Sequence, residues 1–384
     1  MAKYRLGDIA PVSQGSLPNS DQCWLLNLDV VESNTGKVLE YVYVDHSQIG
    51  ASTVSFDLGN VLYSKLRPYL NKVVLPDRAG YATSEMLPLR PNEQVITREY
   101  LTYFLRSPHF VEYINGKTSG AKMPRANMAD LKAVEIECPS LIEQNRITAQ
   151  FDLIASIIDK RQKELSTLDD LIKARFVEMF GDPVHNTAHL SYLPMTEVCE
   201  IIDGDRGKYY PKQEEFYDKE YCLFLNAKNV TDHGFSFSEC MFITKEKDES
   251  LRKGKLKRGD VVLTTRGTLG NLAFYTDMVP YENVRINSGM VILRMNRQII
   301  DELFFIEQFR MQVDEIKKSI ASGSAQPQLP ISTMNKISII MPALKEQKQF
   351  STFVAQVDKS KRAVQKALDE AQLLFDSLMQ KYFG

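Results

Sequence analysis

Two stretches decide the fold: LIEQNRITAQFDLIASIIDKRQKELSTLDDLIKARFVEMFG at residues 141–181 and LKEQKQFSTFVAQVDKSKRAVQKALDEAQLLFDSLMQKYFG at residues 344–384. They align without a gap at an offset of 203 residues and share an opening L-x-E-Q and a closing F-G. Apolar residues recur in both at alternating steps of four and three, which predicts a long helix that buries one seam against another helix. Neither stretch contains an internal Gly or Pro, and each ends at a glycine, where helices commonly stop.

The seams of the two predicted helices have the same phase in the repeat. Each helix is expected to span about 37 residues, or on the order of 55 Å. The apolar residues assigned to the seams are Ile147, Phe151, Ile154, Leu165, Leu168, Ile172, Val354, Val357, Val364, Leu368, Phe375 and Leu378.

The segments before the two helices also correspond, so the whole chain is an internal repeat. Residues 6–15 match 195–204, 58–73 match 258–273, 83–90 match 287–294, and 118–139 match 321–342. The chain then divides into a globular domain (1–140), a helix with a linker (141–184), a second globular domain (185–342) and a second helix (343–384). Short β-branched runs at 261–264 and 337–341 and helical stretches at 99–115 and 300–319 predict a mixed α/β (α+β) fold in both domains.

Composition narrows the function classes. The 384 residues include 47 Lys and Arg against 49 Asp and Glu, so a uniformly basic surface is excluded, while local basic patches are not. The sequence has no run of 18 apolar residues and no signal peptide, and a cytoplasmic location is expected. The five cysteines form no CxxC pair, and His185 and His189 lie in a linker-like stretch without further ligands nearby, so no metal site is expected.

Catalytic motifs are missing. The sequence has neither a G-x-x-x-x-G-K-[ST] phosphate loop nor a G-x-G-x-x-G after a strand. It has no adjacent prolines, which excludes the Asn/Asp-Pro-Pro-aromatic loop of amino-methyltransferases. An E-x-K at residues 315–317 with Asp301 upstream fits a solvated helix face better than a nuclease centre. We therefore expect no catalytic residues in this chain and no cofactor bound by it.

Candidate binding residues lie instead in basic or polar loops, most of which recur in both halves. Arg and Lys neutralise phosphates, Arg, Gln and Asn read base edges, and aromatic rings stack on bases. Solvated hairpins, ordinary exposed loops and simple connectors remain the alternatives for these stretches. The candidate residues are Lys65, Arg67, Tyr69, Asn71, Lys122, Arg125, Arg206, Lys208, Tyr209, Tyr210, Lys212, Thr265, Arg266, Thr268, Asn271, Ser324, Gln326 and Gln328.

The arrangement resembles the specificity (S) subunit of type I restriction–modification systems. The resemblance covers the whole chain and rests on the repeat, on the helix opening P-x-L-x-E-Q, and on the phrases FVEMFGDP (176–183), LGDIAPVSQG (6–15) and GSAQPQLP (323–330). It implies two target-recognition domains separated by two antiparallel coiled-coil helices with pseudo-two-fold symmetry. Each domain would read one half of a split double-stranded DNA target.

The same resemblance implies the partners. Two methyltransferase subunits would dock along the helices and methylate adenine N6 with S-adenosylmethionine, and restriction subunits using ATP and Mg²⁺ would cleave unmodified DNA. Arg161, Arg175 and Lys361 interrupt the helix seams, and we expect them to favour one helix register or to contact a methyltransferase subunit. Two other hypotheses remain: a non-catalytic adaptor whose domains bind proteins, and a complete enzyme with an unrecognised centre.

Overall fold

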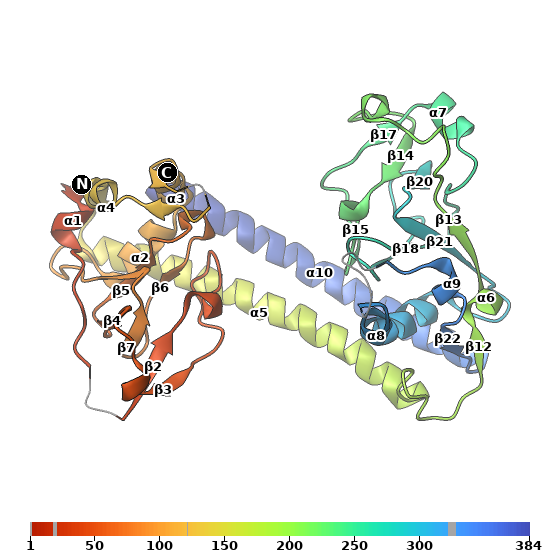
Figure 1. Cartoon of the computed structure of the whole chain (residues 1–384), viewed down its shortest axis with the longest axis horizontal. Helices are drawn as coiled ribbons and strands as arrows, with labels where there is room; N and C mark the ends of the chain where they lie inside the picture. The colour runs from red at the N-terminus through yellow and green to blue at the C-terminus, as the bar shows by residue number, and fades with distance from the viewer. Residues whose placement is uncertain (1, 18–20, 121, 322–327) are drawn as a thin grey trace. The chain divides into compact units, whose positions relative to one another are not determined.

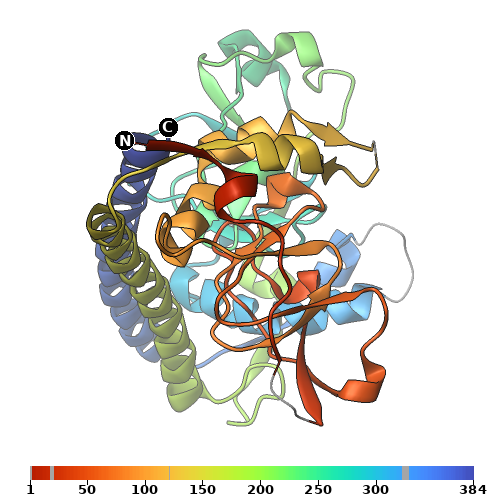
Figure 2. The same cartoon turned by 90° about the vertical axis from the view of Figure 1, so that its left-hand side faces the viewer.

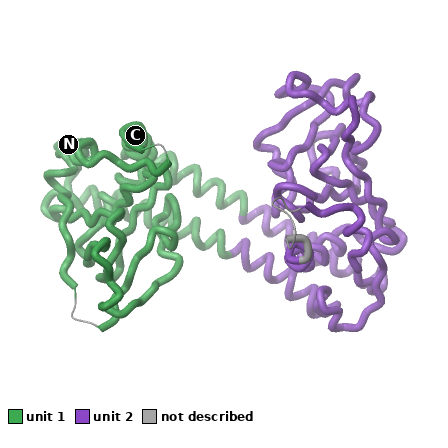
Figure 3. Tube along the Cα trace, in the orientation of Figure 1, with its two compact units in different colours: residues 1–163, 365–384 green, residues 164–364 purple. Residues whose placement is uncertain are grey.

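The computed structural model describes residues 2–17, 21–120, 122–321 and 328–384. The chain divides into two compact units, unit 1 with residues 1–163 and 365–384 and unit 2 with residues 164–364 (Figure 3). The helices α5 (Leu141–Phe180) and α10 (Leu344–Phe383) each begin in one unit and end in the other (Figure 1). Both have 40 residues, slightly more than predicted. No helix among the described residues is long and apolar enough to cross a membrane.

Unit 1 builds small sheets against short helices. Strand order is β3-β2-β7-β4 in the larger sheet and β6-β5-β8 in the second, and β1 pairs with β11. Both chain ends lie at the same edge of this unit in Figures 1 and 2. Its elements before α5 are β1 (Ala2–Arg5), α1 (Leu6–Ile9), β2 (Gln22–Leu26), η1 (Leu28–Val30), β3 (Tyr43–Asp45), η2 (His46–Gln48), β4 (Thr53–Phe56), β5 (Val61–Ser64), η3 (Pro68–Leu70), β6 (Val73–Val74), β7 (Gly80–Thr83), β8 (Met86–Leu89), α2 (Arg98–Arg106), α3 (Pro108–Asn115), β9 (Thr118–Ser119), β10 (Arg125–Ala126), α4 (Met128–Ala133) and β11 (Glu135–Cys138).

Unit 2 follows the same plan. Its sheets have the orders β13-β21-β18-β19 and β17-β14-β20, and β12 pairs with β22 as β1 does with β11. Its elements between the long helices are β12 (Tyr192–Pro194), α6 (Met195–Val198), β13 (Cys199–Asp203), η4 (Gln213–Glu215), β14 (Cys222–Leu225), η5 (Ala227–Asn229), β15 (Val230–Thr231), β16 (Gly234–Phe235), β17 (Phe242–Ile243), α7 (Lys245–Ser250), β18 (Val261–Thr264), β19 (Leu272–Phe274), β20 (Val284–Ile286), β21 (Met290–Met295), α8 (Glu302–Ala321), α9 (Ile331–Met334) and β22 (Ser338–Ile340).

The predicted helical stretch at 99–115 is two helices, because the chain turns at Ser107. The Ser107 hydroxyl accepts a hydrogen bond from the backbone N–H of Phe110 and caps α3. Pro108 follows at the first position of α3, where a missing N–H costs nothing. The residue before a proline disfavours helical dihedrals, so α2 ends at Arg106.

The glutamine of each L-x-E-Q motif anchors its helix to a globular domain. Gln144 donates from Nε2 to the carbonyls of Val95 (2.8 Å) and Pro139 (2.9 Å), and its Oε1 accepts from the N–H of Thr97 (2.9 Å). Both glutamine side chains are fully buried. Because buried polar groups need partners, these bonds fix the start of each helix against the domain.

Gln347 repeats this anchor in unit 2. Its Nε2 donates to the carbonyls of Ile299 (3.1 Å) and Pro342 (2.9 Å), and its Oε1 accepts from the N–H of Asp301 (2.9 Å). The same glutamine thus satisfies the same three kinds of backbone group in each unit.

In unit 1 the first turns of α5 pack against the last turns of α10. Phe151 stacks on Phe383, with ring centroids 5.9 Å apart, and meets the edge of Phe375 at 5.3 Å. The Tyr382 hydroxyl reaches Gln150 at 3.3 Å. These contacts belong to a core that also contains Tyr100 and other residues of α2.

In unit 2 the helices pair with antiparallel polarity. Phe176 meets Phe350 at 5.3 Å between ring centroids, and seven residues earlier on α5 Asp169 accepts from Lys361 at 2.6 Å. Later positions on α10 therefore lie opposite earlier positions on α5. The Lys361 ion pair is consistent with the expected preference for one register.

The predicted seams are correct in the first turns of each helix and incomplete in the last turns. Seven of the named residues are buried: Ile147, Phe151, Ile154, Ile172, Val354, Val357 and Val364. Leu165, Leu168, Leu368, Phe375 and Leu378 are half-buried. The buried face continues instead through four residues that the pattern missed, namely Phe176, Phe180, Met379 and Phe383. An α-helix has 3.6 residues per turn, so a strict alternation of four and three drifts off the buried face.

Candidate nucleic-acid interface

In unit 1 the basic turn after β5 carries Arg67 in an unusual backbone conformation. Arg67 has a φ of +48°, in the left-handed region that residues with a Cβ rarely adopt. Its side chain is exposed and makes no ion pair or hydrogen bond with the described residues. The neighbouring Tyr69 is 49% exposed. Strain of this kind persists where the surrounding structure enforces it, and such residues gather at functional sites.

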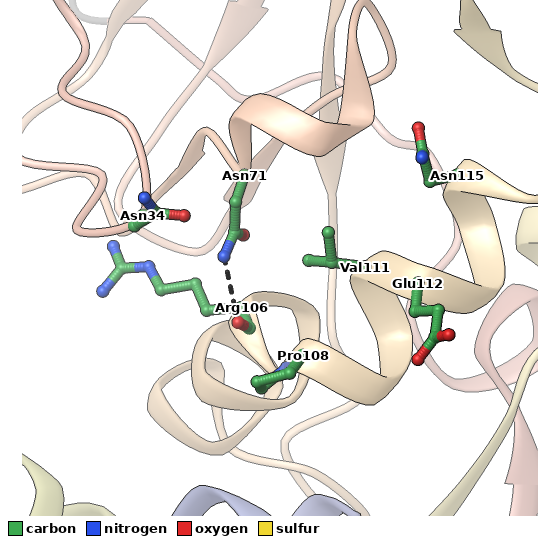
Figure 4. A pocket seen from close by; sticks show the side chains of 7 residues that line it. All are labelled: Asn34, Asn71, Arg106, Pro108, Val111, Glu112 and Asn115. Carbon is green, nitrogen blue, oxygen red and sulfur yellow. Dashed lines mark hydrogen bonds between the residues drawn. The ribbon is translucent and has the colours of Figure 1, made fainter. Parts of the chain in front are cut away.

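Asn71 ends the same turn but points inward. It is buried, and its Nδ2 donates to the carbonyl of Arg106 at 3.0 Å (Figure 4). Both residues line a surface pocket of about 500 Å³ with Asn34, Pro108 and other residues of α3. Asn71 therefore holds the turn in place, so the base-reading role predicted for it is replaced by a structural one.

The Arg106 side chain, beside Asn71, is also held by a backbone carbonyl. Its Nε (3.3 Å) and Nη2 (2.7 Å) donate to the carbonyl of Val73. Burial lowers the pKa of the Arg106 guanidinium to about 10, so the side chain stays protonated at neutral pH.

The second basic stretch of unit 1 lies directly beside this turn. The N–H of Arg67 donates to the carbonyl of Pro124 (2.7 Å), and that of Ala126 to the carbonyl of Lys65 (2.8 Å). Lys122 is exposed at the tip of the β9–β10 hairpin. Two loops more than fifty residues apart in sequence thus form one basic surface.

Glu85 neutralises part of this surface. Arg125 donates to its carboxylate from Nε (3.1 Å) and Nη2 (2.9 Å), and the Lys65 ammonium lies 3.9 Å from it. The hydrogen bond from Arg125 lowers the pKa of the Glu85 carboxyl below its ordinary value. Glu85 lies in the tight turn between β7 and β8, and the carbonyl of this residue accepts from the N–H of Lys65 (3.0 Å).

In unit 2 the corresponding turn follows β18. Arg266 and Thr268 are exposed, and the side chain of Arg266 makes no ion pair or hydrogen bond with the described residues. Thr265 is buried, and its hydroxyl donates to the carbonyl of Gly289 (3.0 Å). Asn271 donates from Nδ2 to the carbonyl of Val230 (3.0 Å). Arg266 and Thr268 therefore form the accessible part of this turn, and Thr265 and Asn271 shape it.

The polar segment before α9 contacts this turn through backbone. The N–H of Leu329 donates to the carbonyl of Thr265 (3.1 Å), which places the half-buried Gln328 beside it. Two other candidates in this segment, Ser324 and Gln326, lie outside the described residues.

The stretch at 203–213 reaches the neighbouring tight turn between β20 and β21. Arg206 donates from Nη2 to Asp203 (3.0 Å) and to the carbonyl of Ser288 (3.2 Å), next to Gly289. Lys208 lies over the ring of Tyr209 at 4.8 Å, and both are exposed. Lys212 is exposed as well, at the start of η4.

Tyr210 differs from its neighbours in this stretch. It is half-buried and packs edge-on against Phe224, with ring centroids 5.7 Å apart. Tyr210 packs under the loop, so Tyr209 is the tyrosine of this pair whose ring is accessible for stacking on a base.

Sequence reasoning missed two residues at the centre of these surfaces, Glu85 and Gly289. Both lie in the matched segments 83–90 and 287–294, so the alignment of the halves contained the signal. Their importance emerges only from the folded chain, where each carbonyl accepts a backbone bond from the basic turn.

The acidic residues considered for a nuclease centre have structural roles. The Asp301 carboxylate accepts from the N–H of Leu303 (3.0 Å) and caps α8, and it also accepts from Ser351 on α10. Glu315 pairs with Lys318 at 2.6 Å. Across residues 2–17, 21–120, 122–321 and 328–384, no group of three or more His, Cys, Asp or Glu side chains could hold a metal ion.

The sequence assigned the seam residues to helix packing and partner docking. Seven of the twelve seam side chains are buried in the chain alone, so these seven contribute to packing within the chain. The helices do present other apolar side chains to solvent: Ile142 (84% exposed), Leu153 (63%), Leu171 (46%), Leu373 (72%) and Leu374 (51%).

Comparison with known proteins identifies the family. The type I restriction modification DNA specificity domain matches residues 1–168 and again residues 192–371. The specificity subunit of type I restriction enzyme MjaIX from Methanocaldococcus jannaschii is 21% identical over 98% of this chain and 91% of its own length. That of EcoDI from Escherichia coli is 26% identical over 136 residues, which are 35% of this chain and 30% of that protein.

Solved structures share the fold. The chain resembles the S subunit of a type I restriction–modification system from M. genitalium (16% identity, TM-score 0.59, 100% of this chain and 96% of that one). It also resembles a chain from a study of assembly and conformational transition in a type I system (19% identity, TM-score 0.55, 100% and 97%). With two matched domains that together cover most of its length, the chain belongs to the type I restriction modification DNA specificity family.

Proposed function

We propose that this chain reads a split DNA target, with one half-site for each unit, and so directs its partner subunits to that target. The observation that carries the proposal is the duplicated surface: in each unit a basic turn, a tight turn and a polar segment meet through the same backbone hydrogen bonds. A DNA-specificity family and two such surfaces together favour two half-sites over one continuous site.

The exposed side chains of both surfaces suit DNA chemistry. Arg266 and Gln328 would contact base edges, where arginine pairs with guanine and glutamine with adenine, and Arg67 would contact a phosphate. Lys122 and Lys208 suit phosphate contacts, which position a protein on the duplex without reading sequence. Basic residues gathered in these loops agree with a net charge near zero for the whole chain.

We place the chemistry in the partners. Adenine-N6 methylation with S-adenosylmethionine would belong to two methyltransferase subunits, and ATP- and Mg²⁺-dependent cleavage to restriction subunits. The outward apolar residues of α5 and α10 would contribute to methyltransferase docking, since residues such as Ile142 and Leu373 are exposed in the chain alone. The long helices would set the spacer between the half-sites, and one DNA turn of roughly 34 Å is within their reach.

Genome-wide mapping of N6-methyladenine tests this function. Cells that make the chain with its methyltransferase subunit would be compared with cells lacking only this chain. We expect a split motif that disappears without the chain. Unchanged methylation in cells where the complex is shown to assemble would overturn the proposal and favour the adaptor alternative.

A further inference from the structure

Each unit has a place where three segments meet, and two backbone hydrogen bonds correspond between the two places. In unit 1 the N–H of Lys65 donates to the carbonyl of Glu85 (3.0 Å), and the carbonyl of Lys65 accepts from Ala126 (2.8 Å). We call residues 65, 85 and 125 the unit 1 junction.

The unit 2 junction consists of residues 265, 289 and 328. Here the N–H of Thr265 donates to the carbonyl of Gly289 (2.8 Å), and the carbonyl of Thr265 accepts from Leu329 (3.1 Å). Residue 125 precedes Ala126 as residue 328 precedes Leu329, so Arg125 and Gln328 occupy the same place.

The side chains at the two junctions differ completely. Unit 1 has Lys65, Glu85 and Arg125, which form an ion-pair cluster. Unit 2 has Thr265, Gly289 and Gln328, with no formal charge among them. The scaffold is shared while the recognition chemistry is exchanged, which is what a protein needs to read two different half-sites with one fold.

The geometry of the cluster leaves Arg125 one usable edge. Its Nε and Nη2 donate to Glu85, which fixes the guanidinium plane. The end formed by Nη1 and the second hydrogen of Nη2 stays available, and Arg125 is 44% exposed. That end offers two parallel donors, the pattern that matches O6 and N7 of guanine.

Gln328 offers a different pattern from the same place. Its amide carries one acceptor and one donor group side by side, which matches N6 and N7 of adenine. Gly289 takes the place that Glu85 has in unit 1, so no carboxylate is present at the unit 2 junction. Gly289 lies beside Arg266, because a Cβ at residue 289 would be 3.8 Å from the Cβ of Arg266.

We infer that residues 125 and 328 are equivalent specificity-determining positions, with Arg125 reading a guanine in one half-site and Gln328 an adenine in the other. Glu85 is a positioning residue that orients Arg125. The inference rests on the proposed function and adds to it the residues that make the two half-sites differ.

The test is methylation mapping of the assembled complex with single variants. Arg125→Gln should change the preference at one base pair of one half-site, with a loss of discrimination of roughly 5- to 150-fold. Gln328→Arg should change one base pair of the other half-site only. Glu85→Gln should relax the same base pair as Arg125→Gln, which a general loss of folding would not do.

Arg78→Gln is the matched control. Arg78 donates from Nε and Nη2 to Asp77, as Arg125 does to Glu85, and also from Nη1 to the Tyr43 hydroxyl (2.8 Å). Its side chain is similarly exposed (42%), but it lies before β7, outside the junction. It should leave the motif unchanged. Three results would overturn the inference. The motif could stay unchanged in both junction variants, one variant could change both half-sites, or Arg78→Gln could change the same base pair. Absence of any split motif with the unaltered chain would instead defeat the proposed function.

Discussion

Units 1 and 2 fasten their long helices with the same residue but present different side chains at their junctions. Gln144 and Gln347 are both fully buried and each satisfies one backbone N–H and two carbonyls. At the junctions, a Lys–Glu–Arg cluster in one unit replaces Thr, Gly and Gln in the other. The anchors are fully buried polar groups with few acceptable replacements, whereas Arg125 and Gln328 are at least partly accessible and tolerate exchange.

The largest expected effect concerns the buried ends of the helices. Phe176→Ala should lower the free energy of unfolding by about 3–5 kcal/mol, because it empties a fully buried site between Phe180, Phe304 and Phe350. Val177→Ala, at the adjacent but 44% exposed position, should cost under about 1 kcal/mol. Urea unfolding of both variants checks this, and equal losses would contradict the assigned buried face.

The glutamine anchors should follow at about 2–3 kcal/mol. Gln144→Ala and Gln347→Ala each leave three backbone groups without their partner, and an unsatisfied buried group costs about 1–3 kcal/mol. The two losses should be similar if the anchors are equivalent. Gln365→Ala is the control, because that side chain is exposed on α10 and, within the described part of the chain, bonds only to Asp369. A loss of stability from only one of the two substitutions would contradict the equivalence of the anchors.

Arg266→Ala tests whether unit 2 reads only one half-site. Removing one bidentate base contact should cost about 1–3 kcal/mol of discrimination at one half-site and leave the other unchanged. Competition binding of the complex to duplexes with single base-pair changes measures it. Equal loss at both half-sites would show that Arg266 supports folding or general phosphate binding.

Arg67→Gly should separate stability from binding. Unit 2 has Gly267 at the aligned position, with a φ of +72°, while Arg67 adopts +48° with a Cβ. Glycine relieves a left-handed strain of about 1–2 kcal/mol but loses more chain entropy, so a net gain of about 0.5–1 kcal/mol is expected.

The same variant should weaken DNA binding and lower the salt slope by about 1 if Arg67 contacts phosphate. Arg67→Lys keeps the positive charge and the left-handed backbone strain, so it should preserve both the DNA affinity and the salt slope. Unaltered DNA affinity in Arg67→Gly would remove Arg67 from the interface.

The smallest effect is a pKa change. Because the hydrogen bond from Arg125 lowers the pKa of Glu85, Arg125→Gln should raise that pKa toward the ordinary value of 4.5. In the unaltered chain the pair stabilises unit 1 above pH 4.5, and its contribution is lost as the pH falls below that value and Glu85 becomes protonated. NMR titration of the carboxyl carbon measures the shift. An unchanged pKa of Glu85 would show that Arg125 does not hydrogen-bond to this carboxylate in solution.

Sequence patterns predicted the repeat, the two long helices and the mixed domains, because these depend on periodicity and on matched segments. They missed the buried ends of the helices, since Phe176 and Met379 leave the strict alternation as the helix follows its own period of 3.6 residues. They also merged α2 and α3, where Ser107 and Pro108 mark the break.

The candidate surface was predicted in part. The loops carrying Arg67, Arg125 and Arg266 were recognisable from their basic character. Whether a polar side chain such as Asn71 points out or in depends on tertiary contacts that no local pattern encodes. Glu85 is an isolated acid in sequence, and only the fold places it between Lys65 and Arg125.

Each unit is proposed to read one half of a split target. The most direct measurement is competition binding of the assembled complex, at fixed salt, to duplexes with both half-sites intact, with either one scrambled, and with both scrambled. We expect that scrambling either half lowers affinity and that Arg266→Ala reduces the sensitivity to only one of the two half-sites. Equal affinity for all four duplexes would contradict it.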